Sequence, residues 1–150
     1  MLPSNVRLAW LAGIIDGEGT VRMYRCHDKR NGHSYIKADV RITNTNAAII
    51  VESVATLRAI TGCDDDVSVY PSVTPKNKKD CFHVQIRRRE AIAKILEAII
   101  PYLIGKKEQA RIVLEWVTHR LVVQPNKGGV TIPLNNIDWS LLDRCRSAIK

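Results

Sequence analysis

The sequence predicts an α+β fold of the order αββαββα, in which helices cover one face of a four-stranded antiparallel sheet. The first observation is that segments with apolar residues at helical spacing alternate with segments in which every second residue is apolar. The second is that polar turn segments separate the strands of each pair, which favours hairpins. The third is length, because 150 residues suffice for one domain with its own core. We expect a single domain at 1–150, with a core at about 5–118 and a C-terminal loop and helix at 119–150.

The first helix and the first hairpin are predicted before residue 45. Ser4 or Asn5 caps a helix that Gly17 and Gly19 end. Its inner stripe consists of Leu8, Leu11, Ala12 and Ile15. The first strand alternates apolar Val21 and Met23 with polar residues, and Asn31-Gly32 signals the turn that follows. The apolar face of the second strand consists of Ile36, Ala38, Val40 and Ile42.

The second helix and the second hairpin follow, and further helices end the chain. Asn44 or Asn46 starts a helix that ends at Gly62, and its inner positions are Ile50, Val54 and Leu57. The third strand is marked by Val67 and Val69, and the fourth by Phe82, Val84 and Ile86. Pro101 ends the next helix, whose apolar positions are Ile92, Ile95, Leu96 and Ile99. Another helix carries Ala110, Val113, Leu114 and Val117, and Asn136 caps a last one with Leu141, Leu142, Cys145 and Ile149.

The composition narrows the class of partner. Apolar residues make up 45% of the chain, which excludes a disordered protein. There are 23 Lys and Arg against 15 Asp and Glu, and the resulting net charge of +8 favours a polyanion such as nucleic acid. Many basic domains nevertheless bind no polyanion. No apolar run is long enough to span a bilayer, and residues 1–7 lack the apolar block of a secretion signal, so we expect no membrane partner.

The cysteines and histidines argue against a zinc site or a disulfide framework. The four cysteines form no Cys-x-x-Cys pair, and the four histidines also lack the spacing of metal ligands. We therefore expect free thiols in a reducing compartment, either cytoplasmic or organellar. We also expect no small-molecule cofactor.

The polar face of the predicted sheet has the composition of a nucleic-acid surface. Its side chains are hydrogen-bonding types suited to base edges, such as Arg for guanine and Gln for adenine. An antiparallel sheet can also leave such a face simply solvated, and this alternative stays open. The residues that we assign to DNA contact on this face are Arg22, Tyr24, Tyr35, Lys37, Asp39, Arg41, Ser68, Tyr70, His83, Gln85 and Arg87.

The first helix combines small residues with two acids. Ala9, Gly13 and Gly17 fall at positions i, i+4 and i+8 on one helix face, where small residues let two backbones approach closely. Two copies packed along this face would bring two carboxylates together at the edge of the sheet, and paired carboxylates can hold divalent cations beside a phosphate. The alternative is a buried amphipathic helix with a glycine-rich end. The predicted dimer interface consists of Ala9, Ala12, Gly13 and Asp16.

The segment Leu11-Ala12-Gly13-Ile14-Ile15-Asp16-Gly17-Glu18-Gly19 resembles the motif that names the LAGLIDADG homing endonucleases. Six of its nine residues are identical to the motif, and Ile14, Gly17 and Glu18 replace Leu, Ala and Asp. The resemblance implies that Glu18 is catalytic and binds Mg²⁺ with the Gly17 carbonyl, and that Mn²⁺ or Ca²⁺ can substitute for binding. It implies that Asp16 caps the N-terminus of the partner helix and belongs with Glu18, Asn44 and Lys106 to the catalytic residues. Because the chain has one motif, it implies a homodimer on a near-palindromic double-stranded DNA site.

The resemblance extends over about residues 5–118 through the order of the elements. It implies that the sheets of two subunits form a DNA-binding saddle and that both DNA strands are cut, leaving 3′ overhangs. Asn44 matches a polar residue beside the metal-bound water, and Lys106 matches a lysine near the scissile phosphate. Ala48 stands where the family has an arginine, which puts the surroundings of the site in doubt. The expected phosphate contacts are Arg25, Lys29, Arg30, Lys78, Lys79 and Lys107.

Two other functions stay open at this point. One is nucleic-acid binding without cleavage, either by an RNA maturase that assists intron folding or by a DNA-binding regulator of the same fold. The other is a structural dimer without a nucleic-acid partner. The acid at position 18 favours the nuclease over both.

Overall fold

The structure is a computed structural model, and it describes residues 1–72, 80–124 and 133–149. The first half of the chain contains α1 (Asn5–Glu18), β1 (Gly19–His27), β2 (Ser34–Asn44), α2 (Ala47–Thr61) and the 3-10 turn η1 (Asp64–Asp66). The second half contains β3 (Ser68–Ser72), β4 (Cys81–Ile86), α3 (Arg89–Ile99), the 3-10 turn η2 (Ile100–Tyr102), α4 (Lys107–Val123) and α5 (Asn136–Ala148). The predicted phosphate contacts Lys78 and Lys79 lie outside the described residues.

The four strands form one antiparallel sheet in the order β1-β2-β4-β3, so the two hairpins meet at β2 and β4. The predicted α+β class and the order αββαββα are confirmed. Gly19 pairs with Ile42 at one end of the first hairpin, and His27 pairs with Ser34 at the other end. Only residues 40–44 of β2 pair with β4, so the first half of β2 has β1 as its single neighbour among the described strands.

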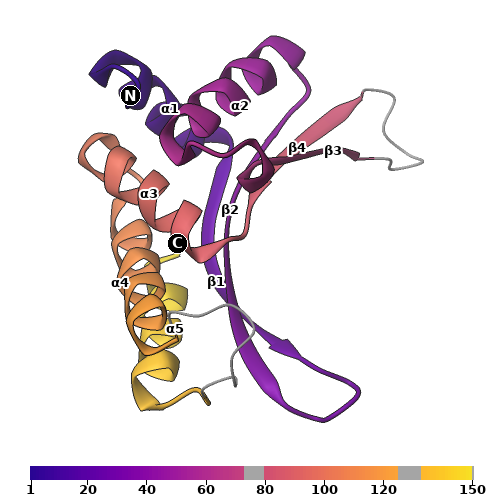
Figure 1. Ribbon diagram of the computed structural model, residues 1–150, viewed down its shortest axis with the longest axis vertical. Helices are drawn as coiled ribbons and strands as arrows, with labels where there is room; N and C mark the ends of the chain where they lie inside the picture. The colour runs from indigo at the N-terminus through magenta and orange to yellow at the C-terminus, as the bar shows by residue number, and fades with distance from the viewer. Residues whose placement is uncertain (73–79, 125–132, 150) are drawn as a thin grey trace.

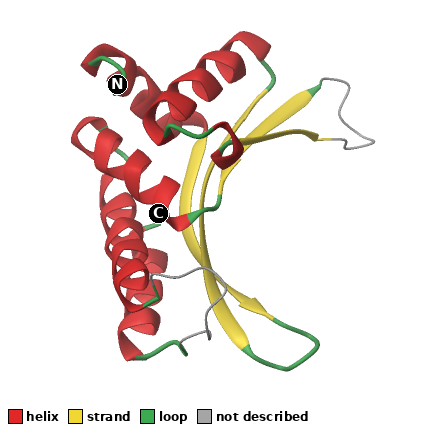
Figure 2. Ribbon diagram, viewed as in Figure 1, coloured by secondary structure: helices red, strands yellow, loops and turns green. Residues whose placement is uncertain are grey.

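The helices lie on one side of this sheet (Figure 1). α1 and α2 contact the sheet near the junction of the two hairpins, and α4 and α5 contact β1. Figure 2 shows the strands curving around the other side, and no helix of the described chain covers it. The sheet therefore presents a concave face that these helices leave uncovered. An uncovered face is what the polar side of the strand pattern predicts.

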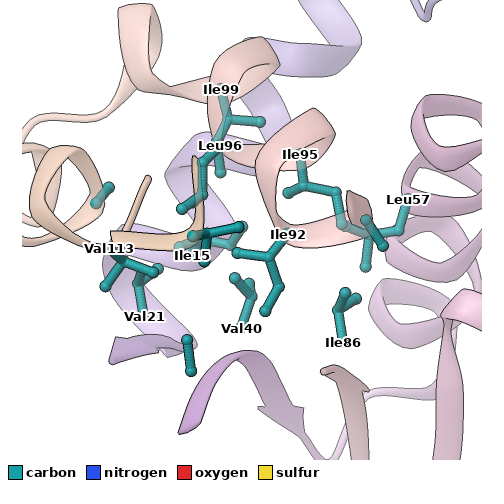
Figure 3. Packing of buried hydrophobic residues seen from close by; sticks show 14 of the residues in the cluster. Ile15, Val21, Val40, Leu57, Ile86, Ile92, Ile95, Leu96, Ile99 and Val113 are labelled. Atoms are coloured by element: carbon teal, nitrogen blue, oxygen red, sulfur yellow. The ribbon is translucent and has the colours of Figure 1, made fainter. Parts of the chain in front are cut away.

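The core fills the space between the helices and the sheet (Figure 3). Ile15 of α1, Val40 of β2 and Ile86 of β4 are fully buried, together with Ile92 of α3 and Val113 of α4. Each such side chain contributes about 2 kcal/mol by leaving water. Five elements thus share one core, and this packing fixes where α1 ends relative to the sheet.

The predicted helix ends are close to those observed, with two differences. Ser4 accepts a hydrogen bond from the amide of Arg7 and Asn46 caps α2, as predicted. However, α1 continues through Gly17 to Glu18, and only Gly19 ends it. A side chain at Gly19 would place its Cβ 2.6 Å from the Ile15 Cα, so this close approach requires glycine. At α5 the cap is Asn135 rather than the predicted Asn136, and Asp138 completes a capping box.

In the described part of the chain, no helix combines the length and the apolar character needed to cross a membrane.

Candidate metal site and nucleic-acid interface

Glu18 and Asn44 lie at the same end of the sheet. Glu18 is the last residue of α1 and is exposed, while Asn44 is the last residue of β2. Gly19 pairs with Ile42. Glu18 directly precedes Gly19 and Asn44 follows Ile42 by two residues, so both lie at this end of the sheet. The Asn44 side-chain oxygen accepts a hydrogen bond from the amide of Asn46 at 2.8 Å, which fixes the junction between β2 and α2.

Asp16 ties the end of α1 to the start of α4. Its two carboxylate oxygens accept hydrogen bonds from the main-chain amides of Ile104, at 2.7 Å, and Lys106, at 2.9 Å. Lys106 in turn donates from its Nζ to the main-chain carbonyl of Asp16. The carboxylate therefore lies at the N-terminus of α4, where the helix dipole favours negative charge. These amides belong to the same chain, so the Asp16 carboxylate caps α4 of its own subunit instead of the partner helix that the resemblance implies.

A cleft of about 860 Å³ lies beside this junction. Asp16 and Gly19 line it on one side, and the start of α4 lines it on the other. The side chain of the buried Gln109 donates to the Val21 carbonyl at 2.9 Å and so holds α4 against β1. The basic residues that line the cleft are Arg22, Lys106, Lys107 and Arg111. Asp16 and Glu108 are the acidic residues that line it, so basic residues outnumber acidic ones in this cleft next to the end of α1.

Sequence reasoning missed Gln109 and Arg111. The signal for Arg111 was present, because Lys107 and Arg111 are separated by four residues and so share a helix face. Nothing in the sequence indicates that Gln109 bonds a strand 88 residues away.

The oxygen donors at the end of α1 suit Mg²⁺. The Glu18 carboxylate is exposed, and Gly17 lies in the last turn, where main-chain carbonyls lack intrahelical partners. Carboxylate and carbonyl oxygens are the ligands that Mg²⁺ prefers. The residues described contain no group of three or more His, Cys, Asp or Glu side chains that could hold a metal. The Glu18 carboxylate and the Gly17 carbonyl are therefore the two candidate ligands that one subunit offers at this end of α1.

Arg22 and Asp39 form the centre of a polar network on the concave face. The Asp39 side chain is fully buried, although it lies on the face without helices. Arg22 donates to both its oxygens, from Nε at 2.9 Å and from Nη2 at 3.2 Å, and Gln85 donates from Nε2 at 2.8 Å. Arg41 Nη2 lies 3.5 Å from the same carboxylate. A buried carboxylate needs such partners, because an unpaired charge is costly to remove from water.

This network corrects two predicted base contacts. Asp39 is 0% exposed and Gln85 is 6% exposed. Both ends of the Gln85 amide are occupied, since its Oε1 accepts a hydrogen bond from the Tyr70 hydroxyl at 3.3 Å. Neither residue is available to a base, so their assignment to direct DNA contact is wrong. They hold other side chains in place instead.

Arg22 is the most constrained cation of the concave face. Its guanidinium carbon lies 4.5 Å from the centre of the Tyr24 ring. The hydrogen bonds with Asp39 raise the pKa of Arg22 above its ordinary value, against the opposing effect of burial. Arg22 therefore remains a fixed cation, and its side chain is 36% exposed.

The rest of the concave face follows the strand register. Thr43, His83 and Tyr70 form one row across three strands. The Thr43 hydroxyl and His83 Nδ1 are hydrogen-bonded at 2.7 Å, and the rings of Tyr70 and His83 are 5.1 Å apart. Ser68 is exposed at the end of β3. These side chains share the face on which the sequence predicted them.

Along the first hairpin, Tyr35 and Lys37 are both exposed, and Lys37 Nζ lies 5.4 Å from the Tyr35 ring centre. Lys29 and Arg30 are exposed in the turn of this hairpin. Arg87 follows the end of β4 instead of extending it, and it lines a cavity of about 220 Å³ with Tyr24 and Lys37.

Arg25 points away from the concave face. It shares the strand parity of Val21 and Met23, whose side chains are buried under the helices. Its Nε and Nη2 donate to the Ser34 hydroxyl at 3.1 and 2.8 Å, and its guanidinium carbon lies 5.3 Å from the Trp139 ring centre in α5. The predicted phosphate contact by Arg25 is therefore wrong, because the side chain packs on the side of the sheet that the helices cover.

The exposed face of α1 contains two of the four residues predicted at the dimer interface, and a third, Asp16, is partly buried. Ala9 and Gly13 are exposed, and a Cβ added at Gly13 or Gly17 would meet nothing within 4 Å. The fold of one subunit therefore does not require glycine at either position. Ala12 is different, because it is 0% exposed inside its own subunit. Its assignment to the dimer interface is wrong, since it lies on the inner stripe of the helix.

Comparison with known proteins shows similarity in structure only. No sequence-family model matches the chain, and no curated protein matches it. The homing endonuclease I-CvuI, bound to the I-CreI target in the presence of Mg with the DNA not cleaved, has a TM-score of 0.59 at 18% identity, over 94% of this chain and 95% of that one. The homing endonuclease I-TnaI has a TM-score of 0.56 at 18% identity, over 99% of each chain.

A third structure is longer than this chain. The LAGLIDADG homing endonuclease I-GzeII, in complex with its DNA target, has a TM-score of 0.62 at 14% identity. The match covers 94% of this chain but 43% of that one. These likenesses establish the fold of the chain, which is that of the LAGLIDADG homing endonucleases.

Proposed function

We propose that this chain, which has the fold of the LAGLIDADG homing endonucleases, is a site-specific DNA endonuclease that acts as a homodimer. The observation that carries the proposal is the position of Glu18. This exposed acid ends the motif-bearing helix beside a basic cleft and at the edge of a concave polar sheet. The DNA complexes among the similar structures support duplex DNA as the partner.

The proposal of a dimer is supported by the exposed small residues of α1 and by the few metal ligands that one subunit offers. One subunit offers the Glu18 carboxylate and the Gly17 carbonyl, whereas a metal site needs further ligands. The exposed positions Ala9 and Gly13 allow a second α1 to approach closely, and packing two copies along this face brings two Glu18 side chains together. A two-fold dimer of this kind would bind a palindromic or nearly palindromic site.

The residues at the end of α1 would hold Mg²⁺, with Mn²⁺ or Ca²⁺ as substitutes for binding. When bound, the metal would supply water activation and neutralise charge on the phosphate. Asn44 would orient the attacking water from the neighbouring strand end. Lys106, fixed by its bond to the Asp16 carbonyl, would place a positive charge beside the phosphate and offset its developing negative charge.

The outcome would be hydrolysis of one phosphodiester bond in each strand, leaving short 3′ overhangs. Phosphate contacts would supply much of the affinity, and among the described residues Lys29, Arg30 and Lys107 remain suited to them. Lys78 and Lys79 belong to the same proposal on sequence grounds alone. Bases would be contacted by the accessible side chains of the concave face and by Arg87 at the end of β4. Those of the face are Arg22, Tyr24, Tyr35, Lys37, Arg41, Ser68, Tyr70 and His83.

The test separates binding from cleavage. The substrate is the uninterrupted duplex reconstructed from the DNA on either side of the coding sequence, incubated with and without Mg²⁺. We expect cleavage by the natural chain and by Glu97→Gln, a control at an exposed acid of α3. Glu18→Gln should bind the duplex with unchanged affinity and show at least a hundredfold slower cleavage, because the metal ligand is lost.

Full cleavage by Glu18→Gln would remove Glu18 from the mechanism. Tight binding by the natural chain without cleavage in Mg²⁺ or Mn²⁺ would instead support the binding-only alternative, and tighter binding of RNA would favour the maturase.

A further inference from the structure

The structure indicates which part of the Arg22 side chain is left for a ligand. A guanidinium has five N–H donors, and Arg22 uses the Nε hydrogen and one Nη2 hydrogen for the Asp39 carboxylate. Among the described residues, no hydrogen bond uses the second Nη2 hydrogen or either Nη1 hydrogen. One Nη1 hydrogen and the remaining Nη2 hydrogen are nearly parallel and point along the end of the side chain, away from Asp39. Arg22 therefore presents a pair of donors at a fixed orientation.

A pair of parallel donors is complementary to guanine. In the major groove guanine presents two adjacent acceptors, O6 and N7, and a bidentate arginine binds both. Adenine presents a donor beside its N7, so the same arginine edge makes a poorer contact there. The Arg22 side chain is 36% exposed, while the carboxylate that holds it is 0% exposed.

We propose that Arg22 binds a guanine end-on in each half of the DNA site, and that Asp39 is the positioning residue that fixes this contact. The proposal rests on the DNA-binding function proposed above and deepens it. Asp39 contacts no base itself. It acts through Arg22, and Gln85 supports it from β4 with a 2.8 Å hydrogen bond.

The surrounding contacts favour a fixed Arg22 over a mobile one. Tyr24 stacks on the guanidinium at 4.5 Å from one side. Tyr70 holds the oxygen of the Gln85 amide, so that the amide nitrogen faces Asp39. The Asp39 carboxylate of β2 thus binds Arg22 of β1 and Gln85 of β4 directly, and Tyr70 of β3 joins the network through Gln85. Arg41 differs, since its single approach to Asp39 is 3.5 Å and makes no hydrogen bond. Fixing a side chain before binding reduces the entropy that binding costs.

The test uses a library of randomised double-stranded DNA, bound in Ca²⁺ and sequenced after selection. We expect the natural chain to enrich guanine at one position of each half-site. Arg22→Ala should reduce this preference by about tenfold or more at that position and leave the other positions unchanged. Arg22→Lys keeps the charge, so it should keep the salt dependence of binding while the guanine preference falls.

Asp39→Asn tests the positioning role. It should lower the preference at the same guanine several-fold, because Arg22 loses the partner that orients it. Glu97→Gln is the control, since Glu97 is exposed on α3, which lies on the other side of the sheet from Asp39. This control should leave the guanine position unchanged. Circular dichroism and thermal melting establish that each variant is folded, and the exposed Arg22 variants keep the proposal testable if Asp39→Asn does not fold.

The outcomes separate this inference from the function on which it rests. If the natural chain enriches no sequence, both are overturned. If it enriches a motif that Arg22→Ala leaves intact, the DNA-binding function stands and the guanine contact is wrong. If Arg22→Ala removes the guanine but a folded Asp39→Asn keeps it, Asp39 has no positioning role.

Discussion

Asp16 and Lys106 are 90 residues apart in the chain and hold each other through main-chain groups. The Asp16 carboxylate accepts the Lys106 amide, and the Lys106 ammonium binds the Asp16 carbonyl. This double contact joins the end of the motif-bearing helix to the start of α4. The proposed metal ligand Glu18 lies two residues beyond it, so its position depends on a contact that sets the end of α1.

We predict that Asp16→Asn lowers the free energy of unfolding by about 1–2 kcal/mol, because an asparagine amide has a single acceptor oxygen, so one of the two main-chain N–H groups loses its acceptor. Urea denaturation measures the change. Cleavage should also slow, since Glu18 and Lys106 lose their fixed geometry. The exposed Asp143→Asn in α5 is the control and should alter neither quantity. Unchanged stability for Asp16→Asn would show that the two amides do not depend on the charge.

Gly13→Leu should convert the dimer to a monomer without unfolding it. A side chain at Gly13 meets nothing within 4 Å of its Cβ in the subunit, and leucine favours the helix over glycine by up to about 1 kcal/mol. Sedimentation velocity measures the assembly, and thermal melting measures the stability. Ala55→Leu, on the exposed face of α2, should leave the dimer intact. A dimer that persists with Gly13→Leu would place the interface elsewhere.

Gly19→Ala, unlike Gly13→Leu, should destabilise the folded subunit. The added Cβ would lie 2.6 Å from the Ile15 Cα, and backbone cannot yield as a side-chain tip can. We expect a loss of about 1–3 kcal/mol in the free energy of unfolding. Chemical denaturation measures it, and Gly17→Ala is the matched control because its Cβ meets nothing within 4 Å. Equal stability of the two variants would contradict the close approach.

Asp138→Ala should be among the most damaging substitutions in the C-terminal part. The buried carboxylate accepts hydrogen bonds from Trp116 Nε1 at 2.9 Å and from the main-chain N–H of Asn135 at 2.8 Å. It also lies 3.5 Å from Arg120 Nη1. Loss of this carboxylate should lower the free energy of unfolding by about 3–5 kcal/mol, because its buried hydrogen bonds and its ion pair with the 2% exposed Arg120 are lost together.

The matched control is Glu115→Gln, which breaks an exposed ion pair between the same two helices, at 3.3 Å from Arg144. It should cost less than about 1 kcal/mol. Calorimetry compares the two variants, and similar losses would mean that burial of Asp138 adds nothing.

Burial raises the pKa of the Cys145 thiol, and this gives a pH dependence. The neutral thiol is favoured in the folded state, so its contribution to stability is fully present below the unfolded pKa. It is lost as the pH rises through the folded pKa. Iodoacetamide at pH 8 should therefore label the partly exposed Cys26, Cys63 and Cys81, and label Cys145 only after unfolding. Mass spectrometry measures the order, and early labelling of Cys145 would refute its burial.

The local sequence determined the elements and the faces of the strands. Alternation at Val21 and Met23 predicted which side of β1 the helices cover, and Asn46 predicted the start of α2. Arg25 shares the parity of the buried residues, so its place on the covered side was present in the same pattern. The nine residues ending at Gly19 indicated the family whose fold the chain has.

Tertiary structure alone decided which polar side chains are accessible. Asp39 alternates like a solvent-facing residue, yet Arg22 and Gln85 cover it from neighbouring strands. Asp16 has its partners near residue 105, and Ala12 is enclosed by its own core. Periodicity follows from the bond geometry of one segment, so sequence predicts it. Burial and pairing depend on segments that are distant in the chain, and only their folding together fixes which groups meet.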